Sequence, residues 1–214
     1  ETLLLLYQKL GNNMLQYLEG MFVVVIYDKL EKNLFIARDR AGKKPLYIFN
    51  DGSKIVFASE LNCLKSLLPL EMDKANFFHY TRMGTFYRKL TPYKNVTELA
   101  AGTYVEIDCS NLKCTEKKYW DIHEFYKTRH TDSKEESLHK VDTFLRQAVK
   151  RRIESSDLEV GCFLSGGIDS GLVTAIASEY NSRLRTFTVS FNGEYDEAPL
   201  AKQVAEKYST RHTE

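Results

Sequence analysis

The chain has 214 residues, enough for one large domain or two small ones, and 43% of them are hydrophobic, which excludes global disorder. Its 30 basic and 29 acidic residues give a formal charge of +1, so we expect neither nucleic acid nor an anionic membrane as a partner. With no secretory signature and no apolar run of transmembrane length, the sequence predicts a cytoplasmic protein.

Residues 1–120 are predicted to form a domain rich in antiparallel strands with helices between them. The near-continuous apolar run of residues 21–27 predicts a strand that is buried on both faces. A polar turn follows it, so this strand and the next are expected to form a hairpin. Further strands are expected at 34–38, 45–49, 54–58 and 103–107, and helices at 1–10, 60–67 and 73–81.

Residues 121–134 are predicted to be a linker, after which the pattern changes to a domain over 135–214. Ser133 and Glu136 have the spacing of a capping box, which predicts the start of a helix over 134–153. The elements expected after it are a strand at 158–164, a helix at 168–180, a strand at 186–191 and a helix capped by Asp196. Strand, helix and strand in this order predict a βαβ unit with a parallel sheet.

The loop between the first of these strands and its helix, residues 165–170, reads Ser-Gly-Gly-Ile-Asp-Ser. Ligands of parallel sheets bind where strands end and helices begin. The two glycines let the backbone approach a ligand closely, and the helix N-terminus favours a phosphate anion. Ser165 and Ser170 supply hydroxyl groups, and Asp169 is suited to hold a Mg²⁺ ion bound to phosphates. A plain strand-to-helix turn would explain the glycines but not the other three side chains.

This loop is not a Walker A motif, because it lacks a Gly-Lys pair followed by Ser or Thr. A Walker loop usually serves transfer or hydrolysis of the terminal phosphoryl group. A loop that binds pyrophosphate as the leaving group serves adenylation instead, in which AMP is transferred to the substrate. The sequence therefore favours an enzyme that uses ATP and Mg²⁺ to activate a carboxylate.

At these residues the chain resembles a known family. Residues 165–170 match the SGGxDS motif of the PP-loop ATP pyrophosphatases, and the whole chain is similar to the glutamine-hydrolysing asparagine synthetases, which are class II amidotransferases. Other segments resemble motifs of that family in the same order. They are residues 18–22, 37–47, 57–60 and 186–191, the last together with 195–198.

The resemblance implies a fold of mixed α/β and α+β class in two domains. Residues 1–120 would be the C-terminal part of an N-terminal-nucleophile glutaminase, an αββα sandwich. Residues 135–214 would be the start of a PP-loop domain with the parallel sheet of the adenine nucleotide α-hydrolases. The family's nucleophilic Cys would lie upstream of Glu1, so we expect no catalytic residue in these 214 residues and no activity from them alone.

The resemblance also implies an activity, the amidation of aspartate to asparagine through β-aspartyl-AMP, with glutamine as the ammonia source and ATP and Mg²⁺ as cofactors. The residues it implies for the pyrophosphate portion are Ser165, Gly166, Gly167, Asp169 and Ser170, with Asp169 also holding Mg²⁺. Phe163 and Val189 would contact the adenosine part. Arg38, Asp39 and Gly42 form a signature of the first domain, and we expect Arg38 and Asp39 to be a structural ion pair beside the turn at Gly42.

Other functions share the scaffold. One is a sibling amidotransferase that acts on a different carboxylate, such as a uronic acid of a surface polysaccharide, and another is a β-lactam-type synthetase. A non-catalytic binding module is a third alternative, against which the intact loop argues. Because the apolar residues 23–25 would form a sheet edge without partner strands, a homodimer is also expected.

Overall fold

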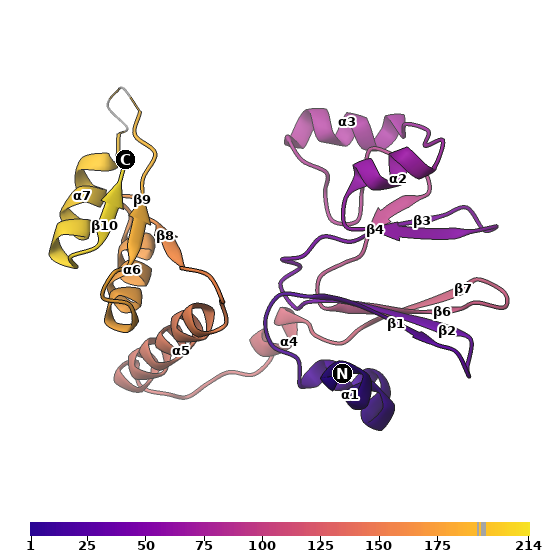
Figure 1. Ribbon diagram of the computed structural model, residues 1–214, viewed down its shortest axis with the longest axis horizontal. Helices are drawn as coiled ribbons and strands as arrows, with labels where there is room; N and C mark the ends of the chain where they lie inside the picture. The colour runs from indigo at the N-terminus through magenta and orange to yellow at the C-terminus, as the bar shows by residue number, and fades with distance from the viewer. Residues whose placement is uncertain (192, 194–195) are drawn as a thin grey trace. The chain divides into compact units, whose positions relative to one another are not determined.

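The computed structural model describes residues 1–191, 193 and 196–214. The chain divides into two compact units, Glu1–Arg129 and His130–Glu214, and each mixes helices with strands (Figure 1). Tyr195, at the start of the motif predicted at 195–198, lies outside the described residues. None of the helices in the described part of the chain has both the length and the apolar character that a membrane span requires.

The first unit contains two antiparallel sheets, with strand orders β1-β2-β6-β7 and β4-β3-β5. The strands are β1 (Val23–Asp28), β2 (Asn33–Arg38), β3 (Tyr47–Asn50), β4 (Ile55–Ala58), β5 (Val96–Glu98), β6 (Thr103–Asp108) and β7 (Lys113–Lys118). The helices are α1 (Thr2–Leu10), the 3₁₀ helix η1 (Gly11–Gln16), α2 (Leu61–Leu67), α3 (Lys74–Met83) and α4 (Ile122–Tyr126). Both predicted hairpins, β1 with β2 and β3 with β4, are confirmed.

The two sheets of the first unit pack face to face, and helices cover their outer faces (Figure 1). The cluster between the sheets includes Ile36, Leu46, Leu99, Val105 and Ile107. On the outer face of the larger sheet, η1 contributes Met14 and Leu15 to a separate cluster. On the outer face of the smaller sheet, α2 contributes Leu64. The layers are therefore helix, sheet, sheet and helix.

Strand β1 differs from its prediction, because it is buried on one face only. Val24 and Ile26 are buried, but Val25 is 39% exposed and Tyr27 is 53% exposed. The cross-strand partner of Val25 is Ile36, which is fully buried. The core between the sheets thus ends at β1, which is an edge strand. An apolar run alone does not reveal this position.

Strands β5 and β7 and helix α4 were not predicted from the sequence. All six residues of β7 are exposed, so the strand has no apolar alternation and is held by its antiparallel pairing with β6. Helix α4 lies within the predicted linker 121–134 and is capped by Asp121, whose side chain accepts a bond from the His123 N–H. Short, exposed elements of this kind leave no periodic signal in a sequence.

The second unit is built on a three-stranded parallel sheet of order β10-β9-β8, which confirms the predicted parallel arrangement. Its strands are β8 (Gly161–Phe163), β9 (Arg185–Phe187) and β10 (Arg211–Thr213), and its helices are α5 (Lys134–Glu154), α6 (Ile168–Tyr180) and α7 (Ala198–Lys207). The capping box of Ser133 and Glu136 at the start of α5 is present as predicted. Strands β8 and β9 are shorter than the expected 158–164 and 186–191, because β8 begins only at Gly161 and β9 ends already at Phe187.

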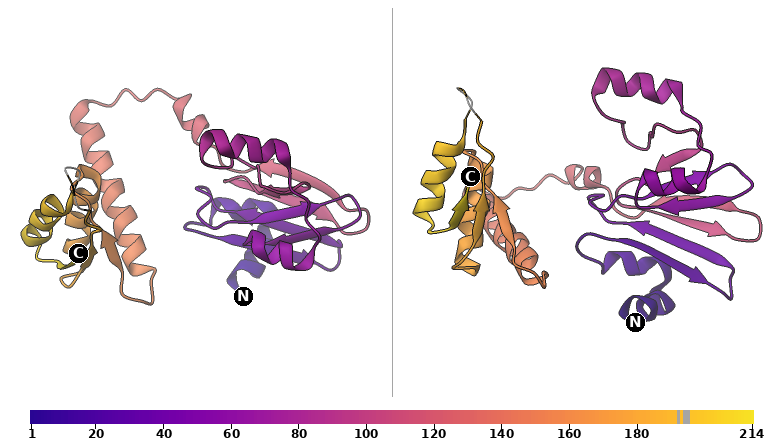
Figure 2. Two further views of the ribbon diagram at one scale, coloured as in Figure 1. Left: turned by 90° about the horizontal axis from the view of Figure 1, so that it is seen from above. Right: turned by 45° about the horizontal axis from the view of Figure 1, so that its top comes forward.

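Helices cover both faces of this sheet (Figure 2). Helices α5 and α6 share a core cluster with Cys162 of β8, whereas α7 packs through Ala201 and Ala205 against Leu164. The N-cap of α7 is Glu197 rather than the predicted Asp196. The Asp196 carboxylate nevertheless accepts a bond from the Ala198 N–H at 3.1 Å, so it satisfies a donor of the first turn.

Candidate functional site

The loop of residues 165–170 lies where β8 ends and α6 begins, as predicted. The Leu164 N–H donates to the Phe187 carbonyl at 2.8 Å, so β8 and β9 end side by side. Helix α6 has Gly167 as its N-cap and no side-chain cap. The first N–H groups of a helix have no intrahelical acceptor, and those of Ile168 and Asp169 have no other acceptor within the described chain. An anion at this position would accept their hydrogen bonds.

Ser165 and Ser170 tie the two ends of the loop together. Their hydroxyl oxygens are 2.8 Å apart, and the Ser165 N–H donates to the Ser170 hydroxyl at 3.1 Å. The Gly167 N–H donates to the Ser165 hydroxyl at 3.3 Å. In the described structure these two side chains therefore shape the loop, and their predicted contact with phosphate stays a prediction.

Gly166 is the point at which α7 packs on the loop. A Cβ atom at Gly166 would lie 2.8 Å from the Leu200 Cβ, 3.0 Å from the Leu200 Cδ1 and 3.4 Å from the Glu197 Cβ. Contacts under 3.0 Å require the backbone to move, because Cβ of Leu200 is fixed to its helix. Only glycine lets the loop keep this close approach.

Gly166→Ala is therefore expected to destabilise the second unit by about 1–3 kcal/mol, the usual cost of overpacking. Urea unfolding followed by circular dichroism would measure the change. Gly171→Ala is the matched control, because a Cβ there would lie 3.9 Å from Val204 Cγ2 and Ala favours a helix interior over Gly by about 0.5–1 kcal/mol. Equal stability changes in the two variants would refute the packing argument.

A cleft of about 400 Å³ opens beside the loop. Its lining residues are Phe163, Leu164, Ser165, Ser170, Phe187, Thr188, Val189 and Glu197. The structure thus brings the two residues predicted for the adenosine part, Phe163 and Val189, to the same cleft as the two serines. Phe163 is 85% exposed and Val189 is 67% exposed, which gives the cleft an apolar wall that an aromatic base can contact.

Sequence reasoning did not assign Thr188 or Glu197 to this cleft. The Thr188 hydroxyl donates to the Leu164 carbonyl and so joins the ends of the two strands. Glu197 belongs to a motif that was noted only as a helix start, and its place beside the loop depends on how α7 packs. No local pattern in the sequence carries that information.

Asp169 is exposed and lies in the first turn of α6. In the part of the chain that the structure describes, no group of three or more His, Cys, Asp or Glu side chains could hold a metal ion. Mg²⁺ is commonly bound by one or two carboxylates together with substrate phosphates. A single exposed carboxylate such as Asp169 could therefore hold Mg²⁺ only together with other ligands, such as phosphate oxygens.

In the first unit, Asp39 organises the loop of residues 39–44. Its side chain is buried, with 1% exposure. Its carboxylate accepts backbone N–H bonds from Phe22 at 3.3 Å, Ala41 at 3.1 Å, Lys43 at 3.0 Å and Lys44 at 3.1 Å. Three donors of one turn, together with the Phe22 N–H just before β1, thus depend on one side chain.

Arg38 does not pair with Asp39, so the predicted ion pair is wrong. The Arg38 guanidinium pairs instead with Glu98 at 2.7 Å and donates to the Lys44 and Gly42 carbonyls, each at 2.7 Å. Gly42 has φ of 63°, and a Cβ there would lie 3.0 Å from the Ala101 Cβ. The two side chains bind the same turn through different backbone groups, Arg38 through carbonyls and Asp39 through N–H groups.

Tyr119 links this signature to the end of β7, because its hydroxyl donates to the Arg38 carbonyl at 2.9 Å. Burial raises the pKa of Tyr119 to about 12, against about 10 in an unfolded chain. The folded state favours the neutral phenol. The stability that this preference contributes is therefore complete below pH 10 and is lost as the pH rises through 12.

Tyr119→Phe is expected to lower stability by about 1 kcal/mol near neutral pH and to lose less stability than the wild type between pH 10 and 12. Urea unfolding across that range would test both effects. Tyr126→Phe, at a side chain that is 78% exposed, is the control and should follow the wild type. An identical alkaline loss in Tyr119→Phe would exclude this phenol as the cause.

Two known protein families match this chain, one in each unit. Residues 1–120 match the glutamine amidotransferase domain family, and residues 140–214 match the asparagine synthase family. These matches define the class as a glutamine amidotransferase domain followed by a synthetase domain.

Individual relatives align with nearly the whole of this chain. A protein of Methanocaldococcus jannaschii, provisionally named a glutamine-hydrolysing asparagine synthetase, is 33% identical over 99% of this chain and 42% of its own length. Asparagine synthetase B of Escherichia coli is 28% identical over 100% of this chain and 36% of its own length. The chain belongs to the glutamine-hydrolysing asparagine synthetase family, whose members are ligases, and it spans about two fifths of the length of these relatives.

Proposed function

We propose that this chain is part of an enzyme that converts aspartate to asparagine, with glutamine as the source of ammonia and MgATP as the activating substrate. The observation that carries the proposal is the loop of residues 165–170, which places free helix N–H groups and one exposed carboxylate at the end of a parallel sheet. Relatives named as glutamine-hydrolysing asparagine synthetases support the choice of acceptor.

The second unit would activate the carboxylate. The N–H groups at the start of α6 would bind the β- and γ-phosphates, and Asp169 would hold Mg²⁺ against them. Phe163 and Val189 would contact the adenosine part across the cleft. With pyrophosphate held as the leaving group, the β-carboxylate of aspartate would take the adenylyl group and form β-aspartyl-AMP. Ammonia would then displace AMP and leave asparagine.

The first unit would belong to the half of the enzyme that releases ammonia from glutamine. Its layers of helix, sheet, sheet and helix support its assignment to the N-terminal-nucleophile glutaminases, with residues 1–120 as this domain and 135–214 as the nucleotide domain. Arg38, Asp39 and Gly42 would be structural there, because their contacts are with the turn of residues 39–44 and its neighbours.

The acceptor is tested by supplying the full-length enzyme with MgATP, glutamine and one of two carboxylates, aspartate or glucuronate. Pyrophosphate release is expected with aspartate and not with glucuronate. Release with glucuronate alone would assign the enzyme to a sibling amidotransferase. Release of inorganic phosphate and ADP with either acceptor would contradict adenylation itself.

A further inference from the structure

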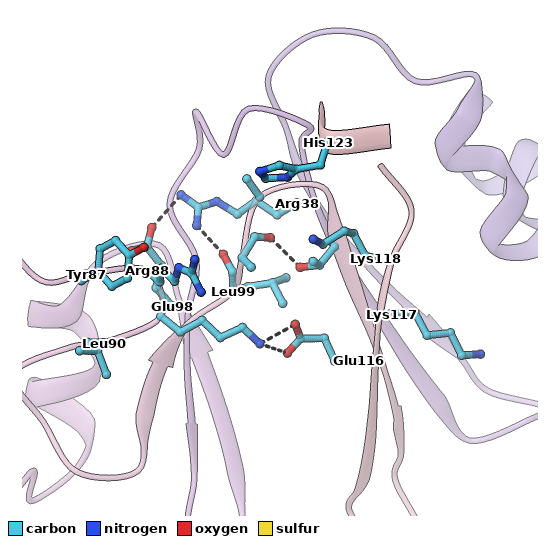
Figure 3. A pocket seen from close by; sticks show the side chains of 14 residues that line it. Arg38, Tyr87, Arg88, Leu90, Glu98, Leu99, Glu116, Lys117, Lys118 and His123 are labelled. Carbon is cyan, nitrogen blue, oxygen red and sulfur yellow. Dashed lines mark hydrogen bonds and ion pairs between the residues drawn. The ribbon is translucent and has the colours of Figure 1, made fainter. Parts of the chain in front are cut away.

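The first unit contains a cavity of about 870 Å³ for which the proposed function has no role (Figure 3). It lies between the segment that follows α3, the loop before β6, strand β7 and helix α4. The charged residues that line it are Arg38, Arg88, Lys89, Lys117, Lys118, Glu98 and Glu116. Five cationic and two anionic side chains are among the lining residues, so the ion pairs that each of them makes decide what charge the cavity offers.

The two carboxylates of the lining are already neutralised. Glu98 pairs with Arg38 at 2.7 Å, and Glu116 pairs with Lys89 at 2.6 Å. Dashed lines in Figure 3 mark both pairs. An anion that entered the cavity would therefore meet no unpaired negative charge on its described walls.

Of the other three lining cations, Arg88 carries the charge that the cavity offers to an anion. Lys117 and Lys118 pair at 3.2 Å and 2.7 Å with Glu106 and Asp121, and the Lys117 ammonium lies over the ring of Tyr104 on the outer face of the larger sheet, so neither lysine brings an unpaired charge to the cavity. Arg88 has no carboxylate partner among the residues described. Its guanidinium lies over the Tyr87 ring, 4.9 Å from the centroid, with all of its hydrogen-bond donors available.

The backbone of Arg88 is held in an unusual conformation. Its φ of 56° lies in the left-handed region, which residues other than Gly, Asn and Asp rarely adopt. Such conformations cost free energy and concentrate at ligand-binding and catalytic positions. Here the conformation presents the guanidinium beside Leu99 at the cavity, as Figure 3 shows.

The remaining walls are apolar. Leu90, Leu99, Ala100 and Ala101 line the cavity between the charged groups. Its volume lies in the range of small-molecule sites and exceeds what one inorganic ion fills. The cavity therefore suits a ligand with an anionic group at one end and an uncharged body of moderate size.

We propose that this cavity binds a phosphate ester of mononucleotide size. Its phosphate would contact the Arg88 guanidinium, and its body would lie against the apolar wall of Leu90, Leu99, Ala100 and Ala101. This site is separate from the nucleotide cleft proposed in the second unit and goes beyond the proposed function.

Trp120 offers a local readout, because it is the one tryptophan of the 214 residues. The backbone N–H of Trp120 donates to the Gly102 carbonyl at 3.2 Å, and the neighbours of Gly102, Ala101 and Thr103, line the cavity. Titration with AMP is expected to change Trp120 fluorescence saturably. Inorganic phosphate should do so at higher concentration, and adenosine should not. No saturable change with AMP, or an equal response to adenosine, would overturn the proposal.

Arg88→Asn sharpens the test, because Asn tolerates the left-handed conformation but carries no charge. AMP binding is expected to weaken about tenfold while the melting temperature stays at or above that of the wild type. Lys65→Gln, at an exposed position of α2, is the charge-matched control and should bind as the wild type does. Unchanged affinity in Arg88→Asn, or loss of the signal in Asp169→Asn, would assign the fluorescence response elsewhere and refute the site.

Discussion

Asp169→Asn in the full-length enzyme is expected to leave the fold intact and to slow AMP formation about a hundredfold or more. An amide oxygen is a weaker ligand than a carboxylate for a hard cation, and lost stabilisation of developing charge has effects of this size. Asp169 is exposed in the first turn of α6, so no buried contact is lost with its charge. The assay is AMP formation from MgATP and aspartate with ammonia supplied directly.

Two controls separate a metal role from a structural one. Glutamine hydrolysis should persist in Asp169→Asn, since that chemistry is proposed for the other unit. Glu179→Gln removes an exposed carboxylate near the opposite end of the same helix and should form AMP at the wild-type rate. Wild-type AMP formation by Asp169→Asn would remove the metal assignment, and a lowered melting point with loss of both activities would make the residue structural.

Asp39→Ala is expected to destabilise the first unit by about 3–5 kcal/mol, because it removes a buried carboxylate that accepts from the backbone N–H groups of Phe22 and of three residues in the turn 39–44. Asp39→Asn should lose less, since one oxygen still accepts. Urea unfolding followed by Trp120 fluorescence reports on this unit. The fluorescence signal is local because Trp120 bonds to Gly102, whose own N–H donates to the Asp39 carbonyl at 2.9 Å.

The matched control is Asp51→Ala. Asp51 also accepts backbone N–H bonds in a turn, from Ser53 and Lys54, but its turn is exposed to water. Water can replace those bonds, so a much smaller loss is expected. A loss in Asp39→Ala no larger than in Asp51→Ala would show that the turn of residues 39–44 does not depend on the buried Asp39 carboxylate.

The features that the sequence predicted correctly are those with a local physical signature. The capping box at Ser133 requires residues three positions apart, and the loop of residues 165–170 requires a strand and a helix on either side. Both features are formed by residues that are close together in the sequence, so the sequence alone reveals them. The two hairpins are similar, since a polar turn between apolar runs leaves few other arrangements.

The features that were missed depend on distant parts of the chain. Arg38 pairs with Glu98, which arrives through the pairing of β5 with β3, and β5 has only three residues. Glu197 reaches the loop because the alanine face of α7 allows a close approach. Strand β7 carries no apolar pattern at all. Each of these three features depends on tertiary packing, which a short stretch of sequence does not reveal.

The most direct test of adenylation follows the oxygen atoms of the aspartate β-carboxylate. The full-length enzyme would receive aspartate labelled with ¹⁸O in the β-carboxylate, together with MgATP and glutamine, and the products would be examined by mass spectrometry. If the loop of residues 165–170 holds pyrophosphate as the leaving group, AMP should carry one ¹⁸O atom for each asparagine formed. Label in inorganic phosphate with ADP as the nucleotide product, or AMP without label, would contradict adenylation of aspartate at this site.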